Sequence, residues 1–320
     1  MNENQPQIES AKKSGPLIVF LSSLLWAGDS PFRKPLLVGG LTAPFISFLE
    51  HILNSAVSLP LLWKKRSEFS ALTWKKILAL IYIGAGASAL AAILFVQGAV
   101  AMNYNFTVAA LLQKFQPIFA IILAAIFLKE KISGRFWMLA IPALIGGYLV
   151  TFGLAAPSIL WRSGGPVLAW AGPVLALLAA LLWAGGTVVG RAMLFDLSFE
   201  FVTGMRFVFG FLFLFFYELV WEKMQFNLMT PLFWRNAFII AMLTGFFALL
   251  LYYYGLRSTK ASVATLMELG YPLALTAVNW KFLGIALDPW QILGAVLLLV
   301  SVTVIVLYGN RQNQSQSLST

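Results

Sequence analysis

The stretch LLWAG at residues 24–28 recurs unchanged at residues 181–185, an offset of 157. At an offset of 155, the run VAALLQKFQP at 108–117 aligns with VATLMELGYP at 263–272, and the pair Phe-Leu at 127–128 recurs at 282–283. Matches of leucine and alanine mean little in an apolar chain, but a shared Trp-Ala-Gly and a shared proline are informative. The sequence therefore predicts an internal duplication.

Composition decides the environment of this duplication. Of the 320 residues, 60% are hydrophobic and only 11% are charged, with a mean hydropathy of +0.84. A soluble domain carries about 25% charged residues, because its surface faces water. A bilayer accepts an apolar outer surface. We therefore predict an integral membrane protein.

A helix that crosses the bilayer core needs roughly 20 apolar residues. Ten segments reach that length, five in each copy of the duplication, and the odd number makes the second copy enter the membrane from the opposite face. The predicted fold is an all-α membrane protein of ten transmembrane helices, arranged as two inverted five-helix repeats. The predicted spans are 15–34, 42–62, 76–98, 104–128, 136–154, 166–190, 199–220, 234–255, 261–283 and 289–308. The repeats cover 15–154 and 166–308, with a linker at 155–165 and tails at 1–14 and 309–320.

The basic residues predict the orientation. With a cytoplasmic N-terminus, 14 of the 22 Lys and Arg residues fall in cytoplasmic segments and 6 in external ones, while Lys114 and Arg206 lie within spans. Cytoplasmic loops carry the excess of basic residues, so both termini are predicted in the cytoplasm. The net charge of +10 is then explained by topology and by contacts with anionic membrane lipids rather than nucleic acid.

Two classes of chemistry are excluded by residue counts. The chain has no cysteine, so disulfides and thiolate chemistry are excluded. His51 is the single histidine, which leaves no cluster for zinc, haem or iron. We expect no metal and no cofactor.

Ionisable side chains inside spans are the first site candidates, because they are costly in a membrane unless paired or hydrated. Span 2 aligns with span 7 and span 4 with span 9, so each repeat offers one acid and one base at matching depth. We expect the ion pairs Glu50–Lys114 and Arg206–Glu268, which either fasten helices or line a hydrated cavity for a charged, amino-acid-like substrate. Asp29 is a weaker candidate.

A coupling proton would need a titratable group in the same region. Glu50, His51 and Glu268 are the candidates for proton coupling, although a buried histidine more often serves as a hydrogen-bonding partner of a neighbouring helix.

Further cavity candidates come from the repeat. Gln97 and Tyr254 precede the equivalent glycines 98 and 255, and Trp26 and Trp183 are equivalent members of the LLWAG stretch. Each tryptophan either anchors the protein at the membrane interface or forms an aromatic wall for an apolar or cationic ligand.

Taken in order, these motifs resemble the drug/metabolite transporter superfamily, specifically its EamA-type ten-helix branch. The resemblance covers residues 15–308 and rests on the two Trp-Ala-Gly stretches, the A-x-L-x-x-x-x-x-P run at 109–117, FLKE at 127–130 and the glycines at 146 and 147. It implies a secondary carrier, often an exporter, of small metabolites, amino acids or amphipathic compounds. The second repeat departs from the pattern, because Glu130 has only Asp288 as a counterpart, behind Gly284-Ile285-Ala286-Leu287.

A carrier that works by alternating access is therefore the expected function, with a small molecule as its partner. The alternative from another class is an intramembrane enzyme acting on lipid-linked substrates. Such an enzyme needs a nucleophile, a metal site or an acid–base pair at the interface. The sequence has no cysteine, no metal cluster and no Gly-x-Ser-x-Gly, so we expect the protein not to be an enzyme.

Overall fold

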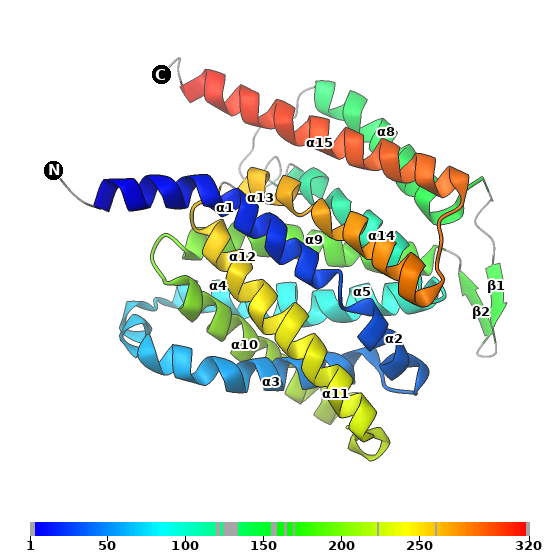
Figure 1. Cartoon of the computed structure of the whole chain (residues 1–320), viewed down its shortest axis with the longest axis horizontal. Helices are drawn as coiled ribbons and strands as arrows, with labels where there is room; N and C mark the ends of the chain where they lie inside the picture. The colour runs from blue at the N-terminus through cyan, green and yellow to red at the C-terminus, as the bar shows by residue number, and fades with distance from the viewer. Residues whose placement is uncertain are drawn as a thin grey trace. The chain divides into compact units, whose positions relative to one another are not determined.

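A computed structural model of the chain describes residues 4–119, 122–123, 134–154, 159–162, 165–168, 170–222, 224–259 and 261–317. The FLKE stretch with Glu130, and part of the predicted linker, lie outside the described residues. The chain divides into two compact units, each taking helices from both repeats (Figure 1). Unit 1 comprises Met1–Ile93 and Gly185–Leu283, and unit 2 comprises Leu94–Ala184 and Gly284–Thr320.

Helices make up most of the described chain. The α-helices of the first repeat are α1 (Asn4–Trp26), α2 (Ser30–Val38), α3 (Ala43–Lys64), α4 (Trp74–Ile81), α5 (Ala91–Ala101), α6 (Phe106–Leu112) and α8 (Gly134–Phe152). Those of the second repeat are α9 (Ala171–Met193), α10 (Phe199–Val220), α11 (Pro231–Ile239), α12 (Ala248–Leu256), α13 (Ala261–Met267), α14 (Gly270–Leu283) and α15 (Pro289–Ser317). Short 3-10 turns are η1 (Arg66–Ala71), η3 (Gln113–Phe115) and η4 (Phe226–Leu228). Helices α1 and α15 extend into the two predicted tails.

The described fold is helical, as predicted, except in one short connection. Strands β1 (Ile159–Arg162) and β2 (Gly165–Leu168) form an antiparallel hairpin in which Leu160 faces Val167. This hairpin lies in the connection between the repeats, and α9 begins at Ala171 rather than at 166. The strands were not predicted, because the residues of β1 fall in the predicted linker and most of those of β2 fall in the apolar start of span 6.

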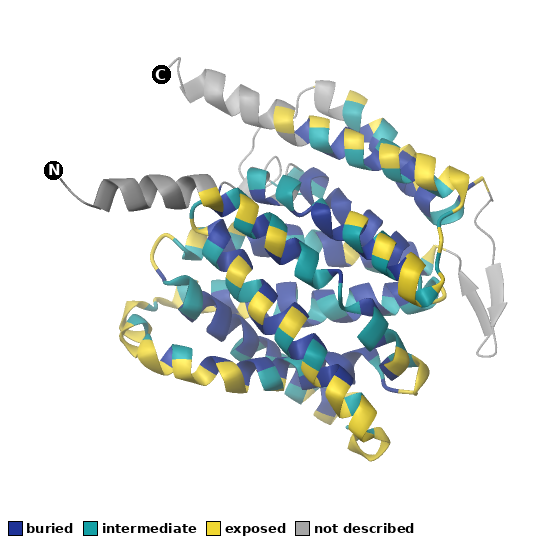
Figure 2. Cartoon of the chain, viewed as in Figure 1, coloured by how far each residue is buried: buried dark blue, intermediate teal, exposed yellow. Residues whose placement is uncertain are grey.

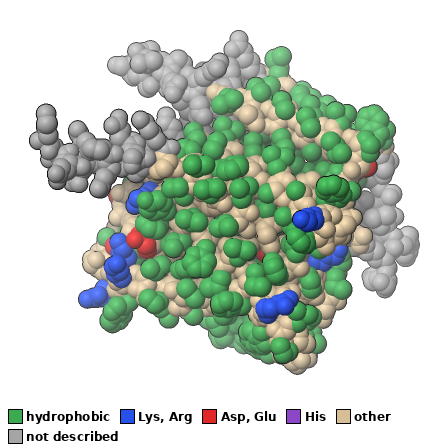
Figure 3. Space-filling model, viewed as in Figure 1, with side chains coloured by type: hydrophobic (Ala, Val, Ile, Leu, Met, Phe, Trp, Pro, Cys, Tyr) green, Lys and Arg blue, Asp and Glu red, His purple; other side chains and the backbone are tan. Residues whose placement is uncertain are grey.

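Five described helical stretches are long and apolar enough to cross a membrane, namely Ala43–Lys64, Trp74–Ala101, Ala171–Met193, Phe199–Val220 and Pro231–Leu256. Two shorter apolar helices are Met138–Phe152 and Pro289–Ile305. The number ten stays a prediction. Buried and exposed positions alternate along helices such as α3 and α12 (Figure 2). Hydrophobic side chains cover most of the face in Figure 3, and exposed ones include Trp63, Phe216 and Trp280.

Three of the predicted spans are interrupted, each close to a proline. Span 1 breaks after Trp26 and resumes at Ser30, with Pro31 in the first turn of α2. Span 4 tightens into η3 two residues before Pro117, and span 9 breaks between α13 and α14, shortly before Pro272. Proline lacks the N–H that would bond four residues back, so the helix cannot continue regularly there. Lys114 and Glu268 lie in the last two interruptions.

Two hydrogen bonds repeat between the halves of unit 1. The N–H of Thr42, at the start of α3, donates to Gln225 Oε1 at 2.7 Å. The N–H of Ser198, at the start of α10, donates to Glu68 Oε2 at 2.8 Å. Glu68 and Gln225 are 157 residues apart, and each follows the helix that the other caps. Packed helices α3 and α10 therefore run in opposite directions, with the two caps at opposite ends.

The third helix of each repeat carries the same backbone irregularity. Between α4 and α5 lies the π-helical segment η2 (Tyr82–Leu90), and between α11 and α12 lies η5 (Ile240–Phe247). Helix α10 packs on η2 and α3 packs on η5. The first contact is close, because a Cβ on Gly84 would lie 2.5 Å from Cβ of Phe209 and 2.7 Å from the carbonyl oxygen of Arg206. Such π segments occur often at functional sites.

Glycine contacts follow the same pattern. In unit 1, a Cβ on Gly255 would lie 2.9 Å from the carbonyl oxygen of Gly15. In unit 2, a Cβ on Gly98 would lie 2.9 Å from the carbonyl oxygen of Gly172. Gly15 aligns with Gly172 and Gly98 with Gly255, so each unit holds one of two equivalent helix contacts. Small residues let membrane helices approach this closely.

Candidate substrate-binding site

Arg206 is the best-defined of the predicted site residues. It lies in the first half of α10 and is 8% exposed. Its Nε donates to Ser88 Oγ at 3.1 Å, Nη1 to the Tyr253 hydroxyl at 3.0 Å and Nη2 to the Ala87 carbonyl oxygen at 2.9 Å. All three acceptors are neutral, and among the described residues Arg206 makes no ion pair within 4.0 Å. The expected pair of Arg206 with Glu268 is therefore wrong.

His51 orients this arginine through Ser88. Its Nδ1 lies 2.8 Å from the carbonyl oxygen of Ser47, and its Nε2 lies 2.9 Å from Ser88 Oγ. A carbonyl oxygen can only accept, so Nδ1 carries the hydrogen. Ser88 already accepts from Arg206, and its own hydrogen is then free to bond Nε2 of a neutral ring. The hydrogen bonds thus favour His51 as a neutral positioning residue.

A second charged cluster joins α2 to α3. Nε and Nη2 of Arg33 contact both carboxylate oxygens of Asp29, at 2.5 and 2.9 Å, and Nη2 also contacts Glu50 Oε2 at 3.0 Å. Thr244 of η5 donates to Asp29 at 3.3 Å. Glu50 thus has Arg33 as its partner, while the expected pair with Lys114 would join the two units and stays a prediction. Nη1 of Arg33 is buried without a partner.

Glu268 lies 3% exposed at the break between α13 and α14. The hydroxyl of Tyr252 donates to Glu268 Oε1 at 2.9 Å, which leaves Thr187 to donate to Tyr252 at 3.3 Å. The Tyr252 ring lies 5.4 Å from that of Trp26, and Tyr271 meets Trp26 edge-on at 6.4 Å. We call Trp26, Tyr252 and Tyr271 the aromatic cluster. It gives unit 1 a rigid apolar surface beside a carboxyl group.

Three of the predicted site residues, Gln97, Lys114 and Trp183, belong to unit 2. Lys114 is 2% exposed in η3, and Gln97 is partly buried in α5. The Trp183 ring lies 5.4 Å from that of Phe95. Neighbouring Gln113 keeps a buried Oε1 without a partner. Unit 2 thus contains an aromatic contact between Trp183 and Phe95, and it also contains the buried polar residues Gln113 and Lys114.

Tyr254 does not join the buried groups. It is partly exposed, and its ring lies 4.1 Å from the guanidinium carbon of Arg257 and 5.1 Å from Phe199. Its neighbours Tyr252 and Tyr253, at 5% and 1% exposed, hold the interior contacts instead. Successive residues of a helix point about 100° apart, so only part of a Tyr-Tyr-Tyr run can face inward. The positions of the polar partners Glu268 and Arg206 decide which part.

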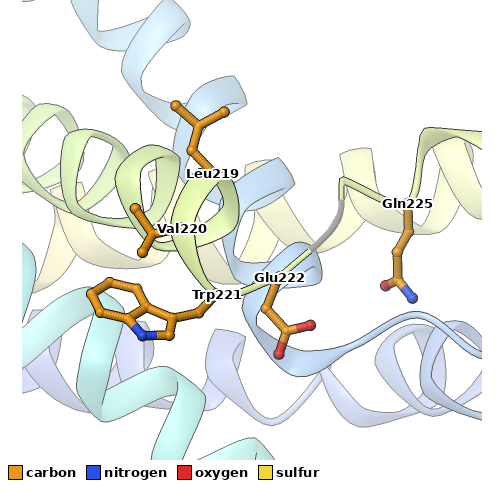
Figure 4. A pocket seen from close by; sticks show the side chains of 5 residues that line it. All are labelled: Leu219, Val220, Trp221, Glu222 and Gln225. Carbon is orange, nitrogen blue, oxygen red and sulfur yellow. The ribbon is translucent and has the colours of Figure 1, made fainter.

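A pocket of about 580 Å³ lies at the end of α10 and is lined by Leu219, Val220, Trp221, Glu222 and Gln225 (Figure 4). It contains none of the predicted site residues, and Trp221 is 72% exposed. Its place at a helix end fits the membrane interface. In the part of the chain that the structure describes, no group of three or more His, Asp or Glu side chains could hold a metal ion.

Comparison with known proteins assigns this architecture. The sequence profile of the EamA-like transporter family matches the chain twice, at residues 13–152 and 170–307. The chain belongs to the EamA-like transporter family. The two matches coincide with the duplication marked by LLWAG, and the resemblance to the drug/metabolite transporter superfamily is confirmed.

One curated protein and one solved structure are similar to this chain along most of its length. The riboflavin transporter ImpX of Fusobacterium nucleatum subsp. nucleatum (strain ATCC 23726 / VPI 4351) is 32% identical over 302 residues, covering 90% of this chain and 96% of that protein. A protein crystal structure aligns with 94% of this chain and 99% of its own, with a TM-score of 0.62 and 17% identity, which shows a shared fold. The chain is thus an integral membrane protein, and its family points to small-molecule transport rather than enzymatic catalysis.

Proposed function

We propose that this protein is a secondary active transporter of riboflavin or a closely related flavin, working by alternating access. The observation that carries the substrate class is the aromatic cluster of Trp26, Tyr252 and Tyr271, in a chain 32% identical to a riboflavin transporter along almost its whole length. Riboflavin joins a flat, uncharged ring system to a chain of hydroxyl groups. Aromatic side chains bind flat rings by stacking and edge contacts.

The contacts that the acidic groups of unit 1 already make also favour a substrate without a positive charge. An amino-acid-like zwitterion, the expectation from the sequence, would use a matched acid and base. Arg33 already neutralises one of the two carboxylates beside it, and Glu268 is bonded to a tyrosine. Neutral aromatic ligands are therefore the first candidates, and amino acids and amphipathic cations serve as comparison ligands.

Alternating access follows from the inverted arrangement of equivalent helices. The reciprocal caps of α3 and α10 support two halves of opposite orientation, which gives a carrier one site that can open to either side. We place both termini in the cytoplasm and the protein in a bacterial inner membrane. Export, expected from the family resemblance, is the proposed direction.

Proton coupling is proposed at Glu268, with Glu50 as the second candidate. Glu268 lies at a helix break and has Tyr252 as a neutral partner, so its carboxyl group can gain or lose a proton without breaking an ion pair with that partner. Glu50 has Arg33, which favours a fixed negative charge. His51, held neutral by Ser47 and Ser88, is assigned to positioning.

Counterflow in proteoliposomes tests the function. We expect vesicles preloaded with riboflavin to accumulate labelled riboflavin transiently, with the label chemically unchanged, and unlabelled amino acids not to compete. Trp26→Ala should abolish this exchange, whereas Trp280→Ala, at a position 69% exposed, should preserve it. Exchange of amino acids but not of flavins would overturn the substrate, and a chemically altered label would favour the enzyme.

A further inference from the structure

We propose that Arg206 and Tyr253 form a hydrogen-bond donor site that receives a carbonyl edge of the flavin ring. The proposal rests on the proposed function, because it places one part of the flavin on named side chains. It adds Tyr253, Ser88 and His51 to the binding machinery, the first as a contact residue and the other two as positioning residues.

Among the described residues, no carboxylate lies within 4.0 Å of the Arg206 guanidinium group. The side chain lies within one of the apolar membrane-crossing helices, and its three partners are two hydroxyls and a carbonyl. Burying a charged group without a counter-charge is costly, so such a residue inside a membrane protein is retained for a function. A cation held by neutral acceptors attracts a ligand that is rich in electron pairs.

Arg206 and Tyr253 have more hydrogen-bond donors than their contacts use. A guanidinium group carries five N–H hydrogens, and Arg206 uses three of them on Ser88, Tyr253 and Ala87. The Tyr253 hydroxyl accepts from Arg206, and among the described residues the structure gives its own hydrogen no acceptor. Two N–H groups of Arg206 and the O–H group of Tyr253 therefore remain as donors for a ligand.

Close packing of the surrounding helices holds Arg206 and Tyr253 in place. Gly84 and Gly210 allow α10 to lie directly against η2, because a Cβ on Gly210 would lie 3.2 Å from the carbonyl oxygen of Gly84. The same Cβ would come within 2.3 Å of the His51 ring on α3. The Tyr253 ring is 1% exposed and lies against Gly190, and the Arg206 guanidinium sits 5.9 Å from its centre. Donors that are fixed in advance bind an acceptor without the cost of ordering them.

Flavin chemistry matches this arrangement. Each carbonyl oxygen of the isoalloxazine ring lies beside an unprotonated ring nitrogen, O2 beside N1 and O4 beside N5, so each edge presents two adjacent acceptors. The planar fork of arginine suits such a two-acceptor edge. Tyr253 and Tyr252 are neighbours in α12 with rings 5.6 Å apart, so the donor site adjoins the aromatic cluster that would hold the ring.

The test measures binding of riboflavin, 2-thioriboflavin and 4-thioriboflavin to the full-length protein in nanodiscs by isothermal titration calorimetry. Sulfur is a weaker acceptor than oxygen, so we expect one of the two thio analogues to bind wild-type protein about 10- to 100-fold more weakly than riboflavin does. In Tyr253→Phe and Arg206→Lys, riboflavin should bind more weakly, and the penalty for that thio analogue should shrink. Tyr254→Phe and Arg257→Lys are the matched controls and should keep the wild-type pattern.

The outcomes separate the two proposals. If wild-type protein binds riboflavin, but Tyr253→Phe and Arg206→Lys keep the full penalty for both thio analogues, the donor site is wrong and the flavin function stands. If neither thio analogue is discriminated by wild-type protein, the donor site is also wrong. If wild-type protein binds no flavin, the proposed function fails first. Because Arg206→Lys could disturb packing, Tyr253→Phe, which removes one oxygen, is the decisive variant.

Discussion

Glu68 and Gln225 stand 157 residues apart, and each accepts a hydrogen bond from the first N–H of a helix in the opposite half. The donors, Thr42 and Ser198, also cap their own helices, with their side chains accepting from Phe45 and Phe201 at 3.3 Å. The duplication thus produces two equivalent hydrogen bonds, one at each end of the α3–α10 pair.

Removing either acceptor should weaken the fold, and Gln225→Ala should do so more, because Gln225 Nε2 also donates to the carbonyl oxygen of Gly40 at 3.1 Å. We expect Glu68→Ala and Gln225→Ala each to lower the free energy of unfolding by about 0.5–2 kcal/mol, the usual range for a helix-end hydrogen bond. The bonds lie at opposite ends of α3, so the double variant should show the sum. Thermal unfolding in detergent measures this, with Glu222→Ala as the control. A strongly non-additive double variant would contradict two independent caps.

Arg33 should matter more to stability than either carboxylate it binds. Arg33→Met leaves Asp29 and Glu50 facing each other without a counter-charge, and breaking such a buried pair costs about 3–5 kcal/mol. Glu50→Gln leaves the Asp29–Arg33 pair and should cost less. Adding Glu50→Gln to Arg33→Met should recover part of the loss. The expression level of folded protein and its thermal midpoint report the order, and equal losses in the two single variants would argue against this cluster.

The contact between η2 and α10 should not tolerate a methyl group. Gly84→Ala is expected to destabilise the protein by about 1–3 kcal/mol, because the added carbon would collide with the backbone of Arg206 and force the helices apart. Riboflavin binding should fall as well, since the donors of Arg206 would shift. Gly134→Ala is the matched control, with no atom within 4 Å of the added carbon. Wild-type stability of Gly84→Ala would show that the segments are not so close.

Glu268→Gln should separate coupling from exchange. Glutamine keeps an acceptor for Tyr252 but cannot take up or release a proton. We expect the variant to lose riboflavin accumulation driven by a proton gradient and to keep riboflavin counterflow, which needs no net proton movement. Glu200→Gln, at a partly exposed ion pair with Lys65, should retain both activities. Gradient-driven accumulation by Glu268→Gln would assign coupling elsewhere.

The absence of cysteine makes the topology directly measurable. Ser70 and Asn227 are exposed in connections that we predict on opposite sides of the membrane. A membrane-impermeant maleimide should label Asn227→Cys in intact cells and Ser70→Cys only after the membrane is opened. The reverse pattern would place the termini outside, and labelling of both in intact cells would contradict opposite sides.

Sequence patterns predicted the duplication because Trp-Ala-Gly and the mid-helix proline are uncommon enough to align. They also predicted that Arg206 and Glu268 are buried, since apolar spans expose so few charges. The pairing of these two residues was wrong because matched depth says nothing of direction. A helix places side chains around its whole circumference, and the partners of Arg206 lie on η2 and α12.

Other features had weaker signals. Arg33, at the outer end of the predicted span 15–34, was one of the six basic residues counted as external. It is only 5% exposed, because α1 ends at Trp26 and the first residues of α2 point inward. The π segments have no composition that marks them in the sequence. The donor role of Tyr253 depended on which of three adjacent tyrosines faces Arg206, and periodicity alone does not choose among them.

The reciprocal caps also constrain how relatives of this protein can diverge. An insertion between Thr42 and Glu68, or between Ser198 and Gln225, would shift one member of each bond and disturb both ends of the bundle together. Insertions and deletions should therefore accumulate in segments outside these two hydrogen-bonded regions, such as the connection that carries β1 and β2. An alignment of many relatives should show its gaps clustered there, with the two capped segments nearly constant in length.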